Sequence, residues 1–183
     1  MDTSLDSAAI AQSSGYSPDV ACAIVDQCAD AGIELVASLP DDWISLVIDR
    51  FDKDSRFTHI PVNREESAIG LCSGVFMSGT GALALMGASG LMTLVYAITK
   101  INFTYEIPVF IIITQRGSLD DGAKFHVSNG LYLERVMDSI SLPYVTIDSS
   151  DKIPQIAAAY HHSRKISRPT VAVLSKKLLQ GKA

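Results

Sequence analysis

Short apolar runs recur along the chain at regular intervals, and this pattern most constrains what it can fold into. Most residues in these runs are apolar, which is typical of strands in a parallel sheet covered on both faces. Segments with helical spacing separate the runs, so strands and helices are expected to alternate. The runs are residues 33–38, 57–62, 82–87, 108–114, 143–147 and 170–174, and the main helical segments between them lie near 41–51, 64–78, 90–103, 129–141 and 151–166. The alternation predicts a three-layer α/β/α domain built on a doubly wound, six-stranded, mainly parallel sheet.

The first helix is marked at both ends. Ser17 is a typical capping residue, Pro18 suits the first helical position, and Gly32 is a typical residue at a helix end. Residues 1–16 are mostly polar and lack the basic segment followed by an apolar one that marks a signal peptide, so we expect a flexible lead-in. Residues 17–183 contain no internal repeat or linker and are expected to form a single domain.

The composition argues against several classes of function. The chain has 183 residues, 48% of them apolar, and a formal net charge of −5, as expected of a globular protein rather than a disordered one. A mildly acidic chain without a basic run gives nucleic acid little electrostatic reason to bind. The longest apolar stretches are far shorter than the roughly 20 residues of a membrane span. Cys22, Cys28 and Cys72 have no CxxC spacing and are expected to be buried thiols in a reducing cytoplasm.

Ligands of doubly wound domains bind beyond the carboxyl ends of the strands. In this chain polar, proline-containing or glycine-containing segments follow four of the predicted strands, at residues 38–40, 61–65, 87–90 and 114–117. We therefore expect the chemistry at this edge of the sheet.

Two adjacent glutamates, Glu65 and Glu66, open the helix that follows the second predicted strand. Asn63 stands three residues before Glu66, which is the spacing of a capping box at a helix N-terminus. A carboxylate in the first turn also gains from the helix dipole. The sequence thus predicts a structural role for Glu66.

Glu65 stands at the head of an apolar helical face, formed with Ala68, Ile69, Cys72 and Phe76. A carboxyl group in that position points toward the core or an interface, and burial would raise its pKa above the usual value of about 4.3 unless a partner compensates. A second face of small residues would allow another helix or backbone to approach closely; its members are Ser67, Gly70 and Gly74.

The stretch E-E-S-A-I-G-L-C-S-G, residues 65–74, resembles the pyrimidine-binding domain of thiamine-diphosphate-dependent 2-oxoacid decarboxylases. In that family a glutamate is followed by small residues at +3 and +7 and by a glycine at +9. Counting from Glu65 meets this pattern with Ala68, Cys72 and Gly74, whereas counting from Glu66 does not. Other similar segments occur along the chain in the family's order: Ser38-Leu39-Pro40-Asp41, Ser89-Gly90-Leu91, Ile107-Pro108, Arg116-Gly117, His126 with Gly130, Leu142-Pro143-Tyr144 and Arg168-Pro169. The R-G…H…G pattern is similar to that of sulfopyruvate decarboxylase alpha subunits and phosphonopyruvate decarboxylases.

The resemblance implies a specific role for Glu65. In such enzymes the glutamate hydrogen-bonds to N1′ of the cofactor's aminopyrimidine and favours the imino tautomer, whose nitrogen then removes the C2 proton of the thiazolium ring. By the same resemblance, other residues would contact the cofactor or an anionic 2-oxoacid. The implied cofactor-binding residues are Glu65, Pro40, Ser89, Gly90 and Leu91, and the implied substrate-binding residues are Asp41, Ser89, Arg116 and His126.

The family also needs a diphosphate-binding domain whose G-D-G motif helps to hold Mg²⁺, and this sequence has no G-D-G. The nearest string, Asp120-Asp121-Gly122, does not open a strand–loop–helix unit, so we expect no metal ligands in this chain. The resemblance then implies a separate beta subunit carrying the G-D-G domain, with thiamine diphosphate and Mg²⁺ held mainly by that partner. The assembly would be α2β2 or higher and would decarboxylate 3-sulfopyruvate or 3-phosphonopyruvate to the corresponding aldehyde.

Two segments depart from the relatives. Where relatives read S-G-L-G-N, this chain has Met92 and Thr93 after the leucine. The acidic loop of phosphonopyruvate decarboxylase is replaced by residues 122–126, where Lys124 suits an anionic substrate. Both 3-substituted pyruvates therefore stay open.

Alternative interpretations remain for some of these residues. The planar fork of Arg116 matches a sulfonate or phosphonate, but Arg116 could equally form a surface ion pair with Asp120 or Asp121. A small serine hydrolase would use Ser89 at a strand-to-helix turn with Asp121 and a histidine, either His161 or His162. A flavodoxin-like module would instead bind an anion or nucleotide at the loop after residue 87, without catalysis.

Overall fold

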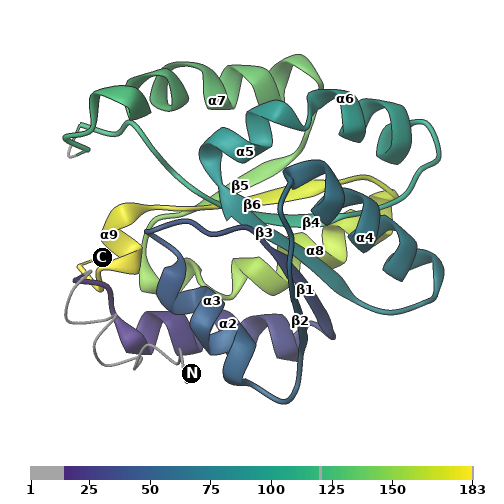
Figure 1. Ribbon diagram of the computed structural model, residues 1–183, viewed down its shortest axis with the longest axis horizontal. Helices are drawn as coiled ribbons and strands as arrows, with labels where there is room; N and C mark the ends of the chain where they lie inside the picture. Colours follow the sequence, from purple (N-terminus) through teal and green to yellow (C-terminus); the bar gives the residue numbers. More distant parts are fainter. Residues whose placement is uncertain (1–14, 120, 183) are drawn as a thin grey trace.

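All six predicted strands are present and pair side by side in one sheet of order β2-β1-β3-β4-β6-β5, in which every pairing is parallel (Figure 1). The computed structural model describes residues 15–119 and 121–182. The predicted lead-in lies outside the described residues up to residue 14. The strands are β1 (Leu35–Ser38), β2 (Thr58–Pro61), β3 (Ala82–Gly87), β4 (Phe110–Thr114), β5 (Tyr144–Ile147) and β6 (Thr170–Leu174). The predicted fold class is confirmed.

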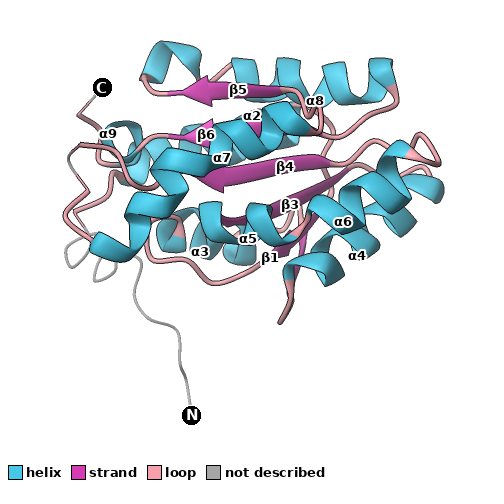
Figure 2. Ribbon diagram, turned by 90° about the horizontal axis from the view of Figure 1, so that it is seen from above, coloured by secondary structure: helices cyan, strands magenta, loops and turns pink. Residues whose placement is uncertain are grey.

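Helices cover both faces of the sheet, as seen most clearly edge-on in Figure 1 and from above in Figure 2. One face carries α2 (Pro18–Asp30), α3 (Ser45–Lys53), α8 (Gln155–Ile166) and the short α9 (Lys176–Leu179). The other carries α4 (Glu65–Met77), α5 (Ala88–Thr93), α6 (Val95–Ala97) and α7 (Val127–Ser139). The helix predicted near 90–103 is divided into α5, α6 and a π-helical turn, η1 (Ile98–Phe103). Two 3-10 turns, η2 (Lys124–His126) and η3 (Ser150–Lys152), precede α7 and α8.

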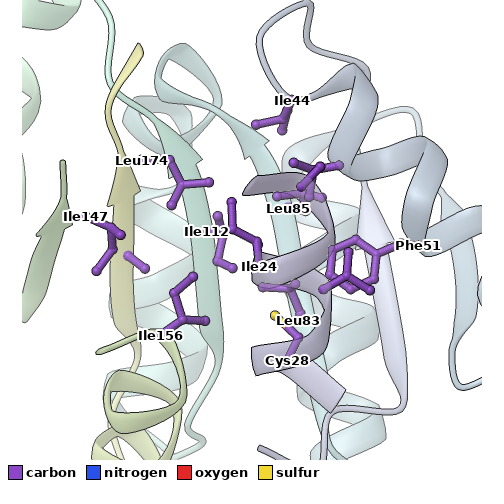
Figure 3. Close-up of a cluster of buried hydrophobic side chains, with 14 of the residues drawn as sticks. Ile24, Cys28, Ile44, Phe51, Leu83, Leu85, Ile112, Ile147, Ile156 and Leu174 are labelled. Atoms are coloured by element: carbon purple, nitrogen blue, oxygen red, sulfur yellow. The ribbon is translucent and has the colours of Figure 1, made fainter. Parts of the chain in front are cut away.

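The sheet has a buried core on each face. Alternate residues of a strand point to opposite faces, so Leu83 and Leu85 of β3 pack under α2 and α3 while Ala84 and Met86 pack under α4 and α5. Figure 3 shows the first of these clusters, to which Ile24, Phe51, Leu85, Ile112 and Leu174 all belong. This arrangement explains why β3, β4 and β6 are buried along nearly their whole length.

The expected start of α2 is confirmed. The side chain of Ser17 accepts a hydrogen bond from the Val20 N–H at 3.4 Å, and Pro18 is the first helical residue. The chain then turns at Gly32, whose φ of 82° is the left-handed conformation that favours glycine.

All three cysteines lie in the described part of the chain and are free thiols. Cys28 and Cys72 are buried as predicted, and burial raises the pKa of both, that of Cys72 to about 12. The prediction was wrong for Cys22, which is exposed because it lies on the outer side of α2. Among the helices that the structure describes, none has the length and apolar character needed to cross a bilayer.

Candidate functional site

The site forms where the topology reverses at the carboxyl edge of the sheet. The chain leaves β1 toward α3 on one face and leaves the neighbouring β3 toward α5 on the other. Such a divergence opens the crevice in which doubly wound domains bind ligands. The edge also receives the start of α4, the loop after β4 and the segment after β6. Most of the sequence-predicted site residues lie on these segments.

Glu65 is the first residue of α4, is half-buried, and lies directly against Gly90 in α5. A Cβ built on Gly90 would stand 2.6 Å from Cγ and 2.8 Å from Oε1 of Glu65, closer than real Cβ contacts come. Glycine at position 90 therefore allows the carboxyl group of Glu65 to lie on the first turn of α5. Thr93 donates a hydrogen bond from Oγ1 to the Gly90 carbonyl at 2.8 Å. Thr93, one of the residues that depart from the family's pattern, therefore stabilises the helical turn that contains Gly90.

The predicted capping box is wrong. The N-cap of α4 is Arg64, and within the described part of the chain its side chain makes no capping hydrogen bond. The helix begins one residue later than a box from Asn63 requires, which places Glu66 at the second helical position. There Glu66 still benefits from the helix dipole, and its Oε2 lies 3.5 Å from Nε of Arg64.

The face of small residues predicted on α4 is exposed in the structure. Among the described atoms, nothing lies within 4 Å of a Cβ built on Gly70 or Gly74, and both glycines are exposed. The close approach of another helix or backbone is therefore absent within this part of the chain.

Arg116 is buried beyond the end of β4 and forms an ion pair with Asp41, which lies in the segment between β1 and α3. Nη2 of Arg116 lies 2.6 Å from Oδ2 of Asp41, and the two side chains are 7% and 13% exposed. The other carboxylate oxygen of Asp41 accepts from the Trp43 N–H at 2.9 Å. A Cβ on Gly87 would collide with Oδ2 of Asp41, so this glycine makes room for the pair.

Of the two surface partners considered for Arg116, Asp121 is bound to His126 instead. Arg116 binds Asp41, and Asp120 lies outside the described residues. Two residues predicted to contact substrate, Asp41 and Arg116, are thus brought together from opposite sides of β3.

Trp43, which follows β1, contacts residues that follow β4 and β6, a role that the sequence did not reveal. The guanidinium carbon of Arg116 lies 3.9 Å from the centroid of its ring, and Nζ of Lys176 lies 5.0 Å from it. The ring of His126 packs edge-on against Trp43 at 5.9 Å between centroids. Nothing in the local sequence indicates which strand ends surround Trp43.

His126 is held by Asp121 in the loop between β4 and α7. The Nδ1 atom of His126 lies 2.8 Å from Asp121 Oδ2, and the Asp121 carboxylate also accepts from the N–H groups of Gly117 and Ala123. Burial of Asp121 raises its pKa, but the hydrogen bonds from His126 and from these N–H groups lower it more, and the pKa falls to about 2. An ionised Asp121 therefore orders the loop that presents His126.

The glycines of the R-G…H…G pattern have a packing role here. Gly117 has a φ of 74°, and a Cβ on it would lie 2.7 Å from the backbone N of Gly130. The loop after β4 thus lies directly on the first turns of α7, with His126 at the N-terminus of that helix. This backbone contact explains the spacing of the pattern.

Ser89 lies in the first turn of α5, and its Oγ accepts a hydrogen bond from Nδ2 of the buried Asn129 at 2.9 Å. The partners needed for a serine hydrolase are not assembled around it. His161 and His162 are exposed on α8, on the other face of the sheet, and Asp121 is bound to His126. The sequence analysis did not single out Asn129 as a partner of Ser89.

Tyr16, the last residue of the predicted lead-in, is half-buried against the core. Burial raises the pKa of its phenol to about 12; nearby Arg116 lowers it, whereas Asp41, Asp42 and Asp121 raise it. The phenol is therefore protonated near neutral pH and lies within electrostatic reach of the Arg116 pair.

His59 has a structural role at the edge of the sheet. Its Nε2 lies 2.7 Å from Oγ of Ser38 and its Nδ1 lies 2.8 Å from Oδ1 of Asp52. These contacts hold the edge strand β2 against β1 and α3. The next element in the chain after β2 is α4, which begins at Glu65.

The sequence of this chain matches one protein family over residues 18–141, described as "Thiamine pyrophosphate enzyme, N-terminal TPP binding domain". The matched range includes Asp41, Glu65, Gly90, Arg116 and His126.

Curated relatives carry a consistent name. The chain is 31% identical over 130 residues to "Sulfopyruvate decarboxylase subunit alpha" of Methanococcus maripaludis, covering 71% of this chain and 78% of that protein. It is 30% identical over 155 residues to the protein of the same name from Methanocaldococcus jannaschii, covering 83% of this chain and 90% of that one. It is 28% identical to "Sulfopyruvate decarboxylase" of Methanosarcina acetivorans, over 85% of this chain but only 40% of that longer protein.

A solved structure shares the fold. The 2-oxoglutarate:ferredoxin oxidoreductase from Magnetococcus marinus superposes with a TM-score of 0.69 at 13% sequence identity, over 87% of this chain and 29% of that one. At this identity the likeness concerns the fold alone.

Proposed function

Since the chain belongs to the thiamine pyrophosphate enzymes and, within them, to the sulfopyruvate decarboxylase alpha subunits, we propose that it is the alpha subunit of a split thiamine-diphosphate-dependent 2-oxoacid decarboxylase. The proposed reaction converts 3-sulfopyruvate to sulfoacetaldehyde and CO2, with 3-phosphonopyruvate as the other candidate substrate. The family expected from the sequence is confirmed, and it disfavours a flavodoxin-like module.

The observation that carries the proposal is the contact between Glu65 and Gly90. A half-buried carboxyl group at a helix start, with a glycine in place of any side chain beside it, can share a proton with a ring nitrogen of a bound heterocycle. Glu65 would hold the aminopyrimidine in this way, with Pro40, Ser89 and Leu91 as the other proposed contacts. Bound thiamine diphosphate supplies the electron sink that decarboxylation of a 2-oxoacid requires.

Arg116, Asp41, His126 and Ser89 are proposed to orient the substrate. Arg116 carries a planar fork that suits a carboxylate, sulfonate or phosphonate, and the Asp41 ion pair and the Trp43 ring fix its orientation. His126 is oriented by Asp121, with its ring against Trp43. Because the orienting contacts are buried, the substrate would meet donors that are already in place.

A partner subunit is part of the proposal. Three curated relatives are named as alpha subunits, while the longer Methanosarcina protein bears the name of the enzyme without a subunit designation. We infer that a beta subunit with a G-D-G motif supplies the diphosphate site and Mg²⁺ in an α2β2 or larger assembly. The free thiols fit a reducing compartment, which supports a cytoplasmic location.

The test is reconstitution with the G-D-G partner, followed by assays of CO2 release from 3-sulfopyruvate and of hydrogen–deuterium exchange at cofactor C2. Glu65→Gln preserves volume but not proton sharing, so exchange should slow by about 10²–10⁴-fold. Glu66→Gln should exchange like the unmodified protein, because Glu66 lies at the helix start with one long contact to Arg64. Normal exchange in Glu65→Gln, or loss of exchange in Glu66→Gln alone, would refute the role of Glu65.

A further inference from the structure

The turn that carries Ser89 borders two carboxyl groups of the proposed site. A Cβ built on Gly87 would collide with Oδ2 of Asp41, and one built on Gly90 would lie 2.8 Å from Oε1 of Glu65. Ser89 stands between these two glycines in the chain and is exposed at the carboxyl edge of the sheet. Its hydroxyl group is thus well placed to meet a ligand bound in the crevice.

A buried amide holds this exposed hydroxyl group. Asn129 of α7 is only 4% exposed, and its Nδ2 atom donates a hydrogen bond to Oγ of Ser89 at 2.9 Å. The helices that carry the two residues share one apolar cluster, to which α5 contributes Leu91 and α7 contributes Leu133. Burial of an amide costs free energy unless the amide is hydrogen-bonded, and an apolar side chain would avoid that cost. An asparagine at this position therefore indicates a role other than packing.

The direction of the hydrogen bond determines what Ser89 can offer a ligand. A serine hydroxyl group has one proton and two lone pairs. Because Nδ2 of Asn129 donates to one lone pair, the proton of Ser89 points away from Asn129. Within the described part of the chain, this proton has no acceptor. Ser89 therefore presents a hydrogen-bond donor, which the bond from Asn129 also strengthens.

We propose that Asn129 is a positioning residue, which orients the hydroxyl group of Ser89 so that it donates a hydrogen bond to an oxyanion of the substrate. The inference rests on the proposed decarboxylase function, whose 2-oxoacid carries a carboxylate and a sulfonate or phosphonate. Arg116 is ion-paired with Asp41, so the pair carries no net charge and an oxyanion beside it gains from a further donor. A donor that is already oriented loses less conformational freedom when the substrate binds.

The experiment reverses this hydrogen bond in the reconstituted complex. Asn129→Asp keeps the shape of the side chain, but a carboxylate only accepts, so the proton of Ser89 would turn toward it and leave lone pairs for the substrate. KM for 3-sulfopyruvate should rise by about 10-fold or more, as expected when a hydrogen bond to a charged group is lost, and kcat should stay nearly unchanged. Ser128→Asp is the matched control for the added charge, because Ser128 is exposed in the same turn of α7. Its KM should stay close to that of the unmodified complex.

A second, uncharged variant removes the donor without reversing the bond. Asn129→Leu should raise KM by about 3-fold, because the side chain of Ser89 would then be distributed over about three staggered rotamers. Both effects should depend on the hydroxyl group. In a Ser89→Ala background, Asn129→Leu should therefore cause no further rise in KM, and Asn129→Asp no more than Ser128→Asp causes.

An equal rise in KM in Ser128→Asp, a rise that persists in the Ser89→Ala background, or a loss of kcat at unchanged KM would overturn the proposal. Binding of 3-sulfopropionate, which carries both anionic groups but no 2-oxo group, can be measured by calorimetry on the complex without turnover. Its Kd should rise by about 10-fold in Asn129→Asp, and identical titrations would reject the role of Asn129. A complex that binds 3-sulfopropionate but does not decarboxylate 3-sulfopyruvate would instead refute the proposed function.

Discussion

Gly90→Ala perturbs the proposed site with a single methyl group. The new Cβ would lie 2.6 Å from Cγ and 2.8 Å from Oε1 of Glu65, whereas carbon atoms in contact normally lie about 3.5–4.0 Å apart. Glu65 must therefore move by about 1 Å. Gly90 is helical and its φ is not positive, so alanine adds no backbone strain and raises helix propensity by about 0.8–1 kcal/mol.

The effects on stability and on activity should separate. Inserting a methyl group into a packed site costs about 1–3 kcal/mol, which the helix propensity partly offsets. Glu65 is half-buried and can swing outward, so unfolding by urea should show a loss of at most about 2 kcal/mol. A displacement of about 1 Å at a catalytic group can lower the rate by about 10²-fold. We expect that loss in kcat and in hydrogen–deuterium exchange at cofactor C2 in the reconstituted complex.

Gly70→Ala is the matched control, because Gly70 lies in the same helix as Glu65 and nothing described lies within 4 Å of a Cβ built there. That variant should keep its activity and become more stable by about 0.5–1 kcal/mol. Normal turnover and C2 exchange in Gly90→Ala would refute the reasoning, because activity would then not depend on the position of the Glu65 carboxyl group against Gly90. Equal losses in both variants would point to the assembly of the complex instead of the Glu65 carboxyl group.

The remaining predictions concern the partner, the substrate and pH. The isolated chain should bind thiamine diphosphate and Mg²⁺ negligibly, and calorimetry that detects micromolar binding would contradict the split site. Arg116→Ala should raise KM for the anionic 2-oxoacid by about 10-fold or more, since a hydrogen bond to a charged group contributes about 1.5–3 kcal/mol; an unchanged KM would remove Arg116 from the site. Because Asp121 has a pKa of about 2 in the folded chain against an ordinary value of 3.8, its stabilising effect should be complete above about pH 4 and disappear as the pH falls toward 2. Urea unfolding should therefore show Asp121→Asn destabilised at pH 7 and nearly equal to the unmodified protein near pH 2, and a difference independent of pH would exclude this linkage.

Local patterns in the sequence were sufficient for the fold class. Each strand is recognisable from its own apolar residues, as in β4, where all five positions are buried. Ser17, Pro18 and Gly32 mark α2 in the same local way, because capping and turn formation depend on residues a few positions apart. The spacing of small residues after Glu65 likewise favours it over Glu66 as the family's glutamate, which stays a prediction.

Two sequence predictions were wrong because each depended on the exact position of one residue in a helix. The capping box from Asn63 was wrong because α4 begins one residue later than the box requires. The burial predicted for Cys22 was wrong because the helical face of α2 that meets the sheet excludes it. Both outcomes depend on how a helix is rotated and positioned against the sheet. Helical spacing alone does not determine this rotation and position to the nearest residue.

The sequence by itself determined the layered α/β architecture, the family and the position of Glu65, because each rests on residues that are neighbours in the chain or on one helix. Only the tertiary structure decided that Arg116 pairs with Asp41, 75 residues away, and that Trp43 lies between Arg116, His126 and Lys176. These residues follow different strands, and the order of strands in the sheet decides which of their ends meet. That order results from the crossover connections and from the packing of helices on both faces, so no local pattern records which side chains become partners.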